Sequence, residues 1–264
     1  MKSMSGCWAE GSNLSVWFLQ RESWLMRSVE RLKRRFYNPD KGWRDGTQLY
    51  MDLVRKYVHG RGRVLDIGAG SGRGFSHGLK GSVGEVVGLD PDEGIMANVE
   101  LDRAVVGIVE DIPFADGGFD AAVSSFALEH IDNAGAAARE IYRILKPGGV
   151  FVFRTPNLWH YATLAARITP QWFHNGVANW ARGLDRTAPE PYHTRYRCNT
   201  VRRIKSRFGN AGFSVACLKR IEPEPAYLQF SAAAFLLGVA YERLVNHVGL
   251  LSAFRVTILG VLQK

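Results

Sequence analysis

The sequence contains few cysteines, and their placement excludes two kinds of protein. Cys7, Cys198 and Cys217 lie far apart in 264 residues, without a C-x-x-C pair or a His/Cys cluster. Zinc sites need closely spaced ligands of this kind, and three scattered cysteines do not make the disulfide framework of a small secreted domain. We therefore expect no metal and a reducing compartment, the cytoplasm.

Targeting patterns and long hydrophobic runs are also scarce. Residues 11–19 are too short and too polar for the apolar core of a signal peptide. The uncharged stretch 225–241 is slightly shorter than the roughly 20 apolar residues that span a membrane. We expect the segment 225–254 to cover a sheet edge, to form a homodimer contact, or to lie on an anionic membrane surface as an interfacial helix, peripheral to the inner face of the membrane.

Acidic residues are outnumbered by basic ones. The chain has 25 Asp and Glu against 34 Lys and Arg, a net charge of +9, and basic clusters lie at 27–35 and 195–207. Such an excess favours anionic partners, and a solvated basic surface is the alternative. Because neither cluster lies in a recognisable nucleic-acid-binding motif, we expect no nucleic-acid partner.

A strand that runs into a glycine-rich turn is the most informative feature present. The aliphatic residues of Val64–Gly72 (V-L-D-I-G-A-G-S-G) indicate a buried parallel strand, and the glycines let the backbone turn sharply against a ligand. Ligands of open α/β sheets bind at this carboxyl end of a strand. Asp66 lies two positions before the first glycine, where a carboxylate repels a pyrophosphate but accepts hydrogen bonds from a cationic amino acid group.

This pattern resembles motif I of the class I S-adenosylmethionine-dependent methyltransferases of the small-molecule type. A nicotinamide-binding Rossmann domain is the rival, but it needs a G-x-G-x-x-G turn without an acid at position 66. The order of the late blocks resembles bacterial methyltransferases associated with surface-glycan or lipid-linked substrates. Further blocks of the resemblance follow in the family's order, at Val87–Pro91, Ile112–Phe114, Phe119–Ser125, Leu128–Ile131 and Glu140–Gly149.

The resemblance and the alternation of strand and helix patterns predict an α/β fold. We expect a Rossmann-like, seven-stranded, mostly parallel sheet with helices on both faces and an antiparallel last strand. The expected strands are 63–67, 85–89, 104–108, 119–124, 149–154, 212–218 and 255–262. The expected helices are 13–37, 47–58, one after Gly72, 93–100, 133–145 and 199–210. The expected divisions are an N-terminal helical extension (1–45), a cofactor-binding core (46–156), a loop-rich acceptor-side insertion with a basic helix (157–211), and the last two strands with the apolar insertion 225–254 (212–264).

S-adenosylmethionine is the cofactor that the resemblance implies. Asp66 would meet its amino acid end, and Asp90 would accept hydrogen bonds from both ribose hydroxyls. Gly68 and Gly70 would let the backbone pack against it. A helix N-cap is the alternative role for Asp90. The other cofactor-binding candidates are Ala69, Pro91, Val109, Glu110, Ser125 and Arg44.

Val109 and Glu110 are candidates because the residue that contacts adenine in the family differs in this sequence. Ile108 stands where relatives have an acid that meets the adenine amino group. The backbone of Val109 and the carboxylate of Glu110 are therefore the candidates at the adenine end. Arg44 is the candidate for the cofactor carboxylate, and a surface role is its alternative.

The acceptor side offers two catalytic candidates. His130 follows the fourth strand and has the chemistry of a general base near neutral pH; a structural histidine is the alternative. His193 lies in the sequence Y-H-T-R-Y-R, where Arg195 suits an anionic acceptor.

The sequence therefore predicts an enzyme that transfers a methyl group to a small-molecule, glycan or lipid-linked acceptor. We expect a hydroxyl as the methylated group, since the Asn-Pro-Pro-Tyr motif of amide or base methylation does not occur. An RNA methyltransferase and a catalytically silent S-adenosylmethionine-binding protein are the alternatives.

Overall fold

The structure is a computed structural model that describes residues 27–72, 75–168 and 194–264. These residues divide into two units. The first comprises 27–44 and 224–243, and the second comprises 45–72, 75–168, 194–223 and 244–264.

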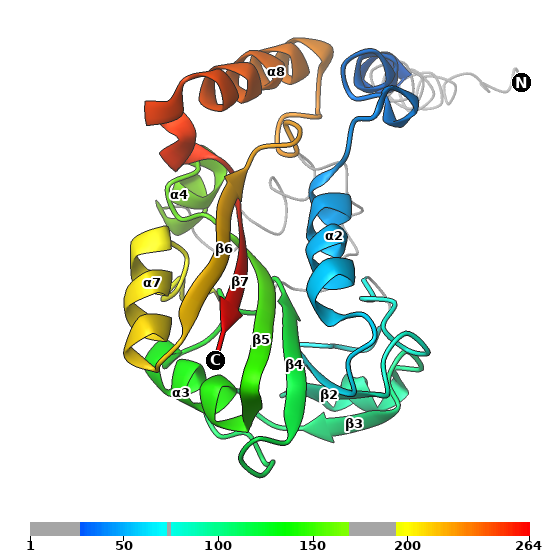
Figure 1. Ribbon diagram of the computed structural model, residues 1–264. Coiled ribbons are helices and arrows are strands. Elements are labelled where there is room, and N and C mark those ends of the chain that lie inside the picture. The colour runs from blue at the N-terminus through cyan, green and yellow to red at the C-terminus, as the bar shows by residue number, and fades with distance from the viewer. Residues whose placement is uncertain (1–26, 73–74, 169–193) are drawn as a thin grey trace, which may run out of the picture. The chain divides into compact units, whose positions relative to one another are not determined.

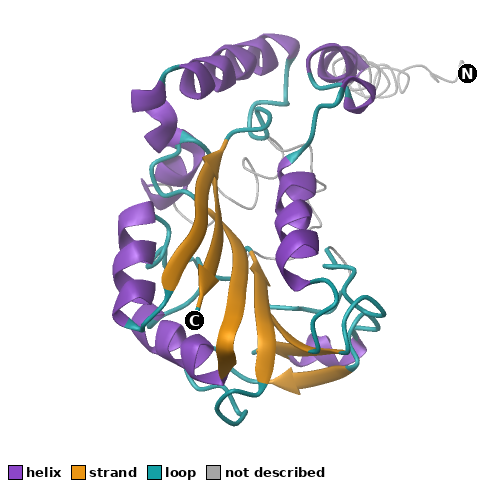
Figure 2. Cartoon of the chain, in the orientation of Figure 1, coloured by secondary structure: helices purple, strands orange, loops and turns teal. Residues whose placement is uncertain are grey.

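A seven-stranded sheet forms the second unit (Figures 1 and 2). Its strand order is β3-β2-β1-β4-β5-β7-β6. The pairs from β3 to β5 are parallel, whereas β7 runs antiparallel to both β5 and β6. The predicted Rossmann-like fold is therefore confirmed. The strands are β1 (Arg63–Ile67), β2 (Glu85–Asp90), β3 (Arg103–Val106), β4 (Phe119–Ser125), β5 (Leu145–Pro156), β6 (Ser214–Ile221) and β7 (Thr257–Gln263).

Helices cover both faces of this sheet (Figure 1). Helix α2 (Gly46–Val58) lies on one face, where Tyr50, Val54 and Val58 are fully buried among aliphatic strand residues. Asp45 and Gln48 form a capping box that fixes the start of this helix. Helices α3 (Ala134–Ile144) and α7 (Val201–Asn210) lie on the opposite face. The polar residues at the carboxyl ends of β1, β4 and β5 are thus held between rigid layers.

Two helices predicted near the glycine turn are not found. Residues 75–80 are not helical, because Gly78 and Gly81 have φ of +57° and +78° and glycine disfavours a helix. The predicted helix 93–100 is a short 3-10 helix, η2 (Glu93–Ala97). It ends at Asn98, whose side-chain amide donates to the carbonyls of Ala69 and Gly70 at 3.1 Å each. The glycine turn is therefore held by side chains that reach it from neighbouring loops.

The described residues form further helices in both units. Residues 27–36 are helical, which agrees with the described part of the predicted helix 13–37. Thr200 is the N-cap of α7, and its side-chain hydroxyl accepts a hydrogen bond from the backbone N–H of Arg203 at 3.2 Å. The other helices are η1 (Pro39–Lys41), α4 (Tyr161–Ile168), α8 (Ala232–His247) and η4 (Gly249–Phe254).

Candidate cofactor site

The turn after β1 has the conformation that its glycines predict. Gly68 and Gly70 have φ of +75° and +53°, values that side-chain-bearing residues rarely adopt. The backbone N–H of Gly68 donates to the carbonyl of Leu89 at 2.8 Å, which ties the turn to the end of β2. A Cβ on Gly68 would lie 2.4 Å from the Cβ of Ala127, whereas a Cβ on Gly70 would meet no atom within 4 Å. Gly68 is thus required by the protein, and the space beside Gly70 is open.

A pocket lies beside this turn, at the carboxyl ends of β1 and β4. It brings together most of the cofactor-binding residues predicted at the amino acid end. Two further residues, Phe75 and His77, lie in the segment that was expected to be helical. The lining residues are Asp66, Gly68, Ala69, Gly70, Ser71, Gly72, Phe75, His77 and Ser125.

Asp90 closes the second strand and faces the glycine turn. Its Oδ2 accepts a hydrogen bond from the backbone of Gly70, and its Oδ1 accepts one from the backbone of Asp92, both at 2.9 Å. Each carboxylate oxygen can accept a further bond. The side chain of Asp92, which accepts from Gly94, is the N-cap of η2. The N-cap alternative for Asp90 is therefore wrong, and its carboxylate has the acceptor capacity that two hydroxyls need.

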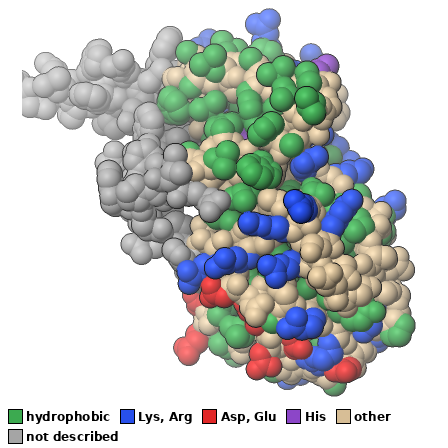
Figure 3. All heavy atoms as spheres, turned by 90° about the vertical axis from the view of Figure 1, so that its left-hand side faces the viewer, with side chains coloured by type: hydrophobic (Ala, Val, Ile, Leu, Met, Phe, Trp, Pro, Cys, Tyr) green, Lys and Arg blue, Asp and Glu red, His purple; other side chains and the backbone are tan. Residues whose placement is uncertain are grey.

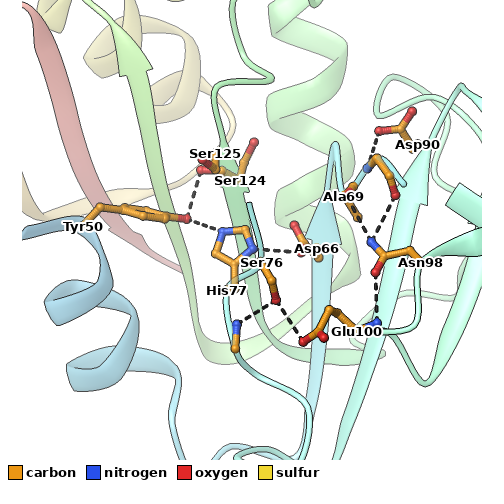
Figure 4. A network of polar contacts seen from close by, with 12 residues as sticks. Tyr50, Asp66, Ala69, Ser76, His77, Asp90, Asn98, Glu100, Ser124 and Ser125 are labelled. Atoms are coloured by element: carbon orange, nitrogen blue, oxygen red, sulfur yellow. Dashed lines mark hydrogen bonds and ion pairs between the residues drawn. The ribbon is translucent and has the colours of Figure 1, made fainter. Parts of the chain in front are cut away.

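A buried chain of hydrogen bonds fixes Asp66 (Figure 4). Nδ1 of His77 lies 2.8 Å from Oδ2 of Asp66, and Nε2 of the same ring lies 2.8 Å from the hydroxyl of Tyr50. Tyr50 donates in turn to the carbonyl of Ser124 at 3.1 Å. Burial raises the pKa of the Tyr50 hydroxyl well above its ordinary value. No sequence motif signalled His77, since the expected helix would have placed it without regard to Asp66.

The second carboxylate oxygen of Asp66 is not used by this chain of hydrogen bonds. Oδ1 is buried and has no hydrogen-bond partner among the described residues. A buried carboxylate oxygen without a donor is unfavourable. A cationic group bound in the pocket would supply the missing donor, so the orphaned oxygen marks the place where the sequence predicted an ammonium group.

The candidates for the adenine end are less well defined. Pro91 is exposed and Val109 is buried. Oε1 of Glu110 accepts hydrogen bonds from the backbones of Asp132 and Asn133 at 3.1 Å each. Glu110 therefore holds the start of α3, and the contacts of these three residues with adenine stay predictions.

The acceptor side is only partly described. His130 is half-buried in the loop after β4, where its backbone donates to the carbonyl of Ala127. His193 lies outside the described residues, and Arg44 belongs to the first unit. Arg195 is exposed and forms an ion pair with Asp132 at 2.7 Å. The catalytic and binding roles of these residues stay predictions.

Glu129 carries a buried carboxyl group, and the sequence did not predict that this group would be buried. Its side chain lies inside the loop after β4, and burial raises the pKa of its carboxyl to about 7. Oε2 accepts a hydrogen bond from the Thr155 hydroxyl at 3.1 Å, and Thr155 accepts one from the amide of Asn199 at 2.7 Å. The loop beneath the acceptor side is thus built on a carboxyl that titrates near neutral pH.

The described residues fit S-adenosylmethionine. Asp66 has a buried acceptor for the ammonium group, Gly70 leaves its side of the pocket open, and Asp90 has spare acceptors for a ribose. Within the described ranges, no cluster of three His, Cys, Asp or Glu side chains could hold a metal ion. Geometry and charge therefore agree with the cofactor that motif I implies.

Comparisons with known proteins give the same class. Residues 65–153, from β1 to β5, match the family model described as methyltransferase domain. The chain thus carries a class I methyltransferase domain, for which S-adenosylmethionine is the cofactor.

Individual relatives match part of this chain by sequence, and a solved structure matches more of it by fold. The mitochondrial arginine-hydroxylase NDUFAF5 of Rattus norvegicus is 32% identical over 137 residues, which cover 50% of this chain and 38% of that protein. The demethylmenaquinone methyltransferase of Corynebacterium kroppenstedtii is 38% identical over 110 residues, 39% of this chain and 46% of that protein. A solved S-adenosylmethionine-dependent methyltransferase from Mesorhizobium loti superposes with a TM-score of 0.54 and 19% identity, covering 83% of this chain and 98% of that one. The chain spans less than half of the length of these two relatives, so the similarity defines the domain and its fold.

Proposed function

We propose that this protein transfers the methyl group of S-adenosylmethionine to a hydroxyl of a small-molecule, glycan or lipid-linked acceptor. The observation that carries the proposal is the pair of carboxylates, Asp66 and Asp90, at the ends of neighbouring parallel strands on either side of an open glycine turn. The cofactor supplies a methyl group that is already electrophilic. The protein therefore needs to hold and orient the reactants and exclude water.

The roles of the residues follow from their positions. Asp66, held by His77, receives the ammonium group at its second oxygen, and Asp90 receives the ribose hydroxyls. His130, in the loop after β4, takes the proton of the acceptor hydroxyl. A relative that acts on demethylmenaquinone supports a small-molecule acceptor, and the lack of an Asn-Pro-Pro-Tyr motif supports a hydroxyl.

A labelled-methyl assay tests this proposal. The purified protein is incubated with methyl-labelled S-adenosylmethionine and fractionated cell extract, with and without nuclease. We expect label in a nuclease-resistant small-molecule, glycan or lipid fraction, and much less label with the Asp90→Ala variant when the cofactor concentration is near the wild-type Kd. Label lost on nuclease treatment would favour the RNA methyltransferase, and cofactor binding without any transfer would favour a silent binding protein.

We further propose that the protein works at an anionic membrane surface, as a peripheral protein on the cytoplasmic side. None of the helices in the described residues is long and apolar enough to cross a bilayer. The apolar residues of α8 divide instead into two sets. Phe235 and Val239 are buried against Val29 and Tyr37 in the first unit. Leu236 and Leu237 are exposed, so they are free for an interfacial contact.

The exposed set continues into the residues that follow. Leu244, Val248 and Phe254 are exposed, and Leu250 is 88% exposed. Exposed apolar side chains of this size, grouped in sequence, mark an interaction surface. Figure 3 shows Lys and Arg side chains grouped on the side of the second unit that carries α7. The exposed basic residues of α7 are Arg202, Arg203, Lys205 and Arg207.

Vesicle cosedimentation tests the membrane proposal. We expect the protein to pellet with phosphatidylglycerol vesicles at low salt and to be released by high salt, since each basic residue near such a surface contributes about 1 kcal/mol. A Leu237→Glu, Leu250→Glu variant should stay in solution, whereas Val106→Glu, on the edge strand β3, should pellet as the wild type does. Phe235 is unsuited to this test because it is fully buried. Failure to pellet, together with a stable dimer in light scattering, would assign the surface to a homodimer.

A further inference from the structure

Arg154 is a buried cation at the carboxyl end of β5. Its side chain is only 5% exposed, and it lies opposite Ser125 in the pairing of β5 with β4. Nε donates to the Ser125 hydroxyl at 2.7 Å, and Nη1 donates to the Thr47 hydroxyl at 2.8 Å. The guanidinium is therefore fixed by α2 on one side and by a pocket-lining residue on the other.

Three aromatic rings surround this guanidinium. Its central carbon lies 4.3 Å from the ring centroid of Phe75, 4.6 Å from that of Phe126 and 4.9 Å from that of Tyr50. Cation–π contacts form within about 6 Å. Phe126 holds its position with φ of +54°, which is uncommon for a residue with a side chain. The local structure is thus arranged around a positive charge.

A counterion is missing from this arrangement. Within the described ranges, no carboxylate forms an ion pair with Arg154, and its side chain bonds only the two neutral hydroxyls of Ser125 and Thr47. The carboxylates of Asp45 and Glu129 act on it only at longer range, and Glu129 is itself bonded to Thr155. Burying a charged group costs several kcal/mol unless an opposite charge offsets the loss of hydration. The site therefore calls for an anion that the described protein residues do not supply.

The position of Arg154 indicates which anion this is. Along a strand, alternate residues face the same side of the sheet, and Val152 and Arg154 share the α2 side with Val64 and Asp66. Ser125 and Phe75, which contact Arg154, also line the pocket that Asp66 lines. Arg154 lies directly behind these two lining residues, so a carboxylate and a guanidinium lie on one face of the sheet at the same edge. This charge pattern complements a zwitterionic amino acid group.

We propose that Arg154 binds the carboxylate of the cofactor's methionine moiety while Asp66 binds its ammonium group. The assignment rests on the cofactor site proposed above and replaces Arg44, the sequence-based candidate for this contact. Arg154 selects ligands that carry the intact amino acid end.

Decarboxylated S-adenosylmethionine provides the test, because it lacks only the group that Arg154 binds. Calorimetry on the wild type should show S-adenosylmethionine binding about 10- to 100-fold more tightly than the decarboxylated ligand, the strength of a charge-assisted hydrogen bond. Arg154→Gln should bind the two ligands within about twofold of each other. Arg154→Lys, which keeps the charge but loses the planar fork, should retain part of the preference. Arg220→Gln, on β6, is the matched control and should discriminate as the wild type does.

The outcomes separate the role of Arg154 from the cofactor site itself. A wild type that binds both ligands equally overturns the role of Arg154 alone, as does an Arg154→Gln variant that still discriminates. A wild type that binds neither ligand overturns the cofactor site, and the role of Arg154 with it. Should Arg154→Gln fail to fold, Ser125→Ala, which removes the acceptor of Nε, replaces it and should reduce the preference.

Discussion

Gly68 and Gly70 lie two residues apart in one turn, yet the structure predicts different effects of replacing each by alanine. Both have positive φ, so either substitution costs about 1–2 kcal/mol of stability for the left-handed backbone alone. At Gly68 the new Cβ would lie 2.4 Å from the Cβ of Ala127. Removing that overlap requires a shift of the β4 loop, which costs about 1–3 kcal/mol more.

We therefore expect Gly68→Ala to lower the free energy of unfolding by about 2–5 kcal/mol. Gly70→Ala should lower it by only about 1–2 kcal/mol, but should weaken cofactor binding more than tenfold, because its Cβ enters the open side of the pocket. Gly148→Ala is the matched control. Gly148 has φ of +75°, no atom lies within 4 Å of its Cβ position, and it lies near the start of β5, at the opposite end of that strand from the pocket.

Urea unfolding and calorimetry with S-adenosylhomocysteine measure the two effects separately. Gly148→Ala should match Gly70→Ala in stability and the wild type in cofactor binding. The reasoning is refuted if Gly70→Ala binds the cofactor product as the wild type does, or if Gly68→Ala is no less stable than Gly148→Ala.

Two further variants test the polar groups around the pocket. Because the folded-state pKa of Glu129, about 7, lies above the ordinary 4.5, the folded protein loses stability as pH rises between these values. Glu129→Gln should therefore raise the free energy of unfolding by up to about 3 kcal/mol at pH 8 and leave it nearly unchanged at pH 4.5, and equal melting-temperature shifts at both pH values would contradict the burial argument. His77→Leu leaves Asp66 buried without its partner and should lower the free energy of unfolding by about 3–5 kcal/mol in urea. A double variant with Asp66→Asn should lose less than His77→Leu alone, and an additive loss would show that the two side chains do not interact.

The fold was predictable because its signals are local. Strand β1 has the predicted bounds, and α2 starts within one residue of its predicted start. Both elements are recognisable from neighbouring residues alone, because aliphatic runs, helix caps and glycine or proline at the ends are local patterns. The wrong prediction of a helix after Gly72 also has a local cause. The residues that follow have helical spacing only if Gly78 and Gly81 are ignored, and both adopt positive φ.

The site was predictable only where the family motif names it. Asp66, Gly68, Gly70 and Ser125 meet in one pocket, as motif I and the end of β4 indicate. His77 and Arg154 carry no such signal, because each acquires its role from partners far away in the sequence. Tyr50 and Thr47 on α2 fix them, and no local pattern shows that a helix will place those hydroxyls at the ends of β1 and β5.

Asp90 gives the most direct test of the central claim, that the pocket at the end of β1 binds S-adenosylmethionine. Calorimetric titration with S-adenosylhomocysteine compares the wild type with Asp90→Ala, which lacks the carboxylate proposed to accept hydrogen bonds from the ribose hydroxyls. We expect one molecule bound per wild-type chain and a loss of about 1.5–3 kcal/mol of binding free energy in the variant, with circular dichroism confirming that both are folded. No binding to the wild type, or equal binding to a folded Asp90→Ala variant, would contradict the account.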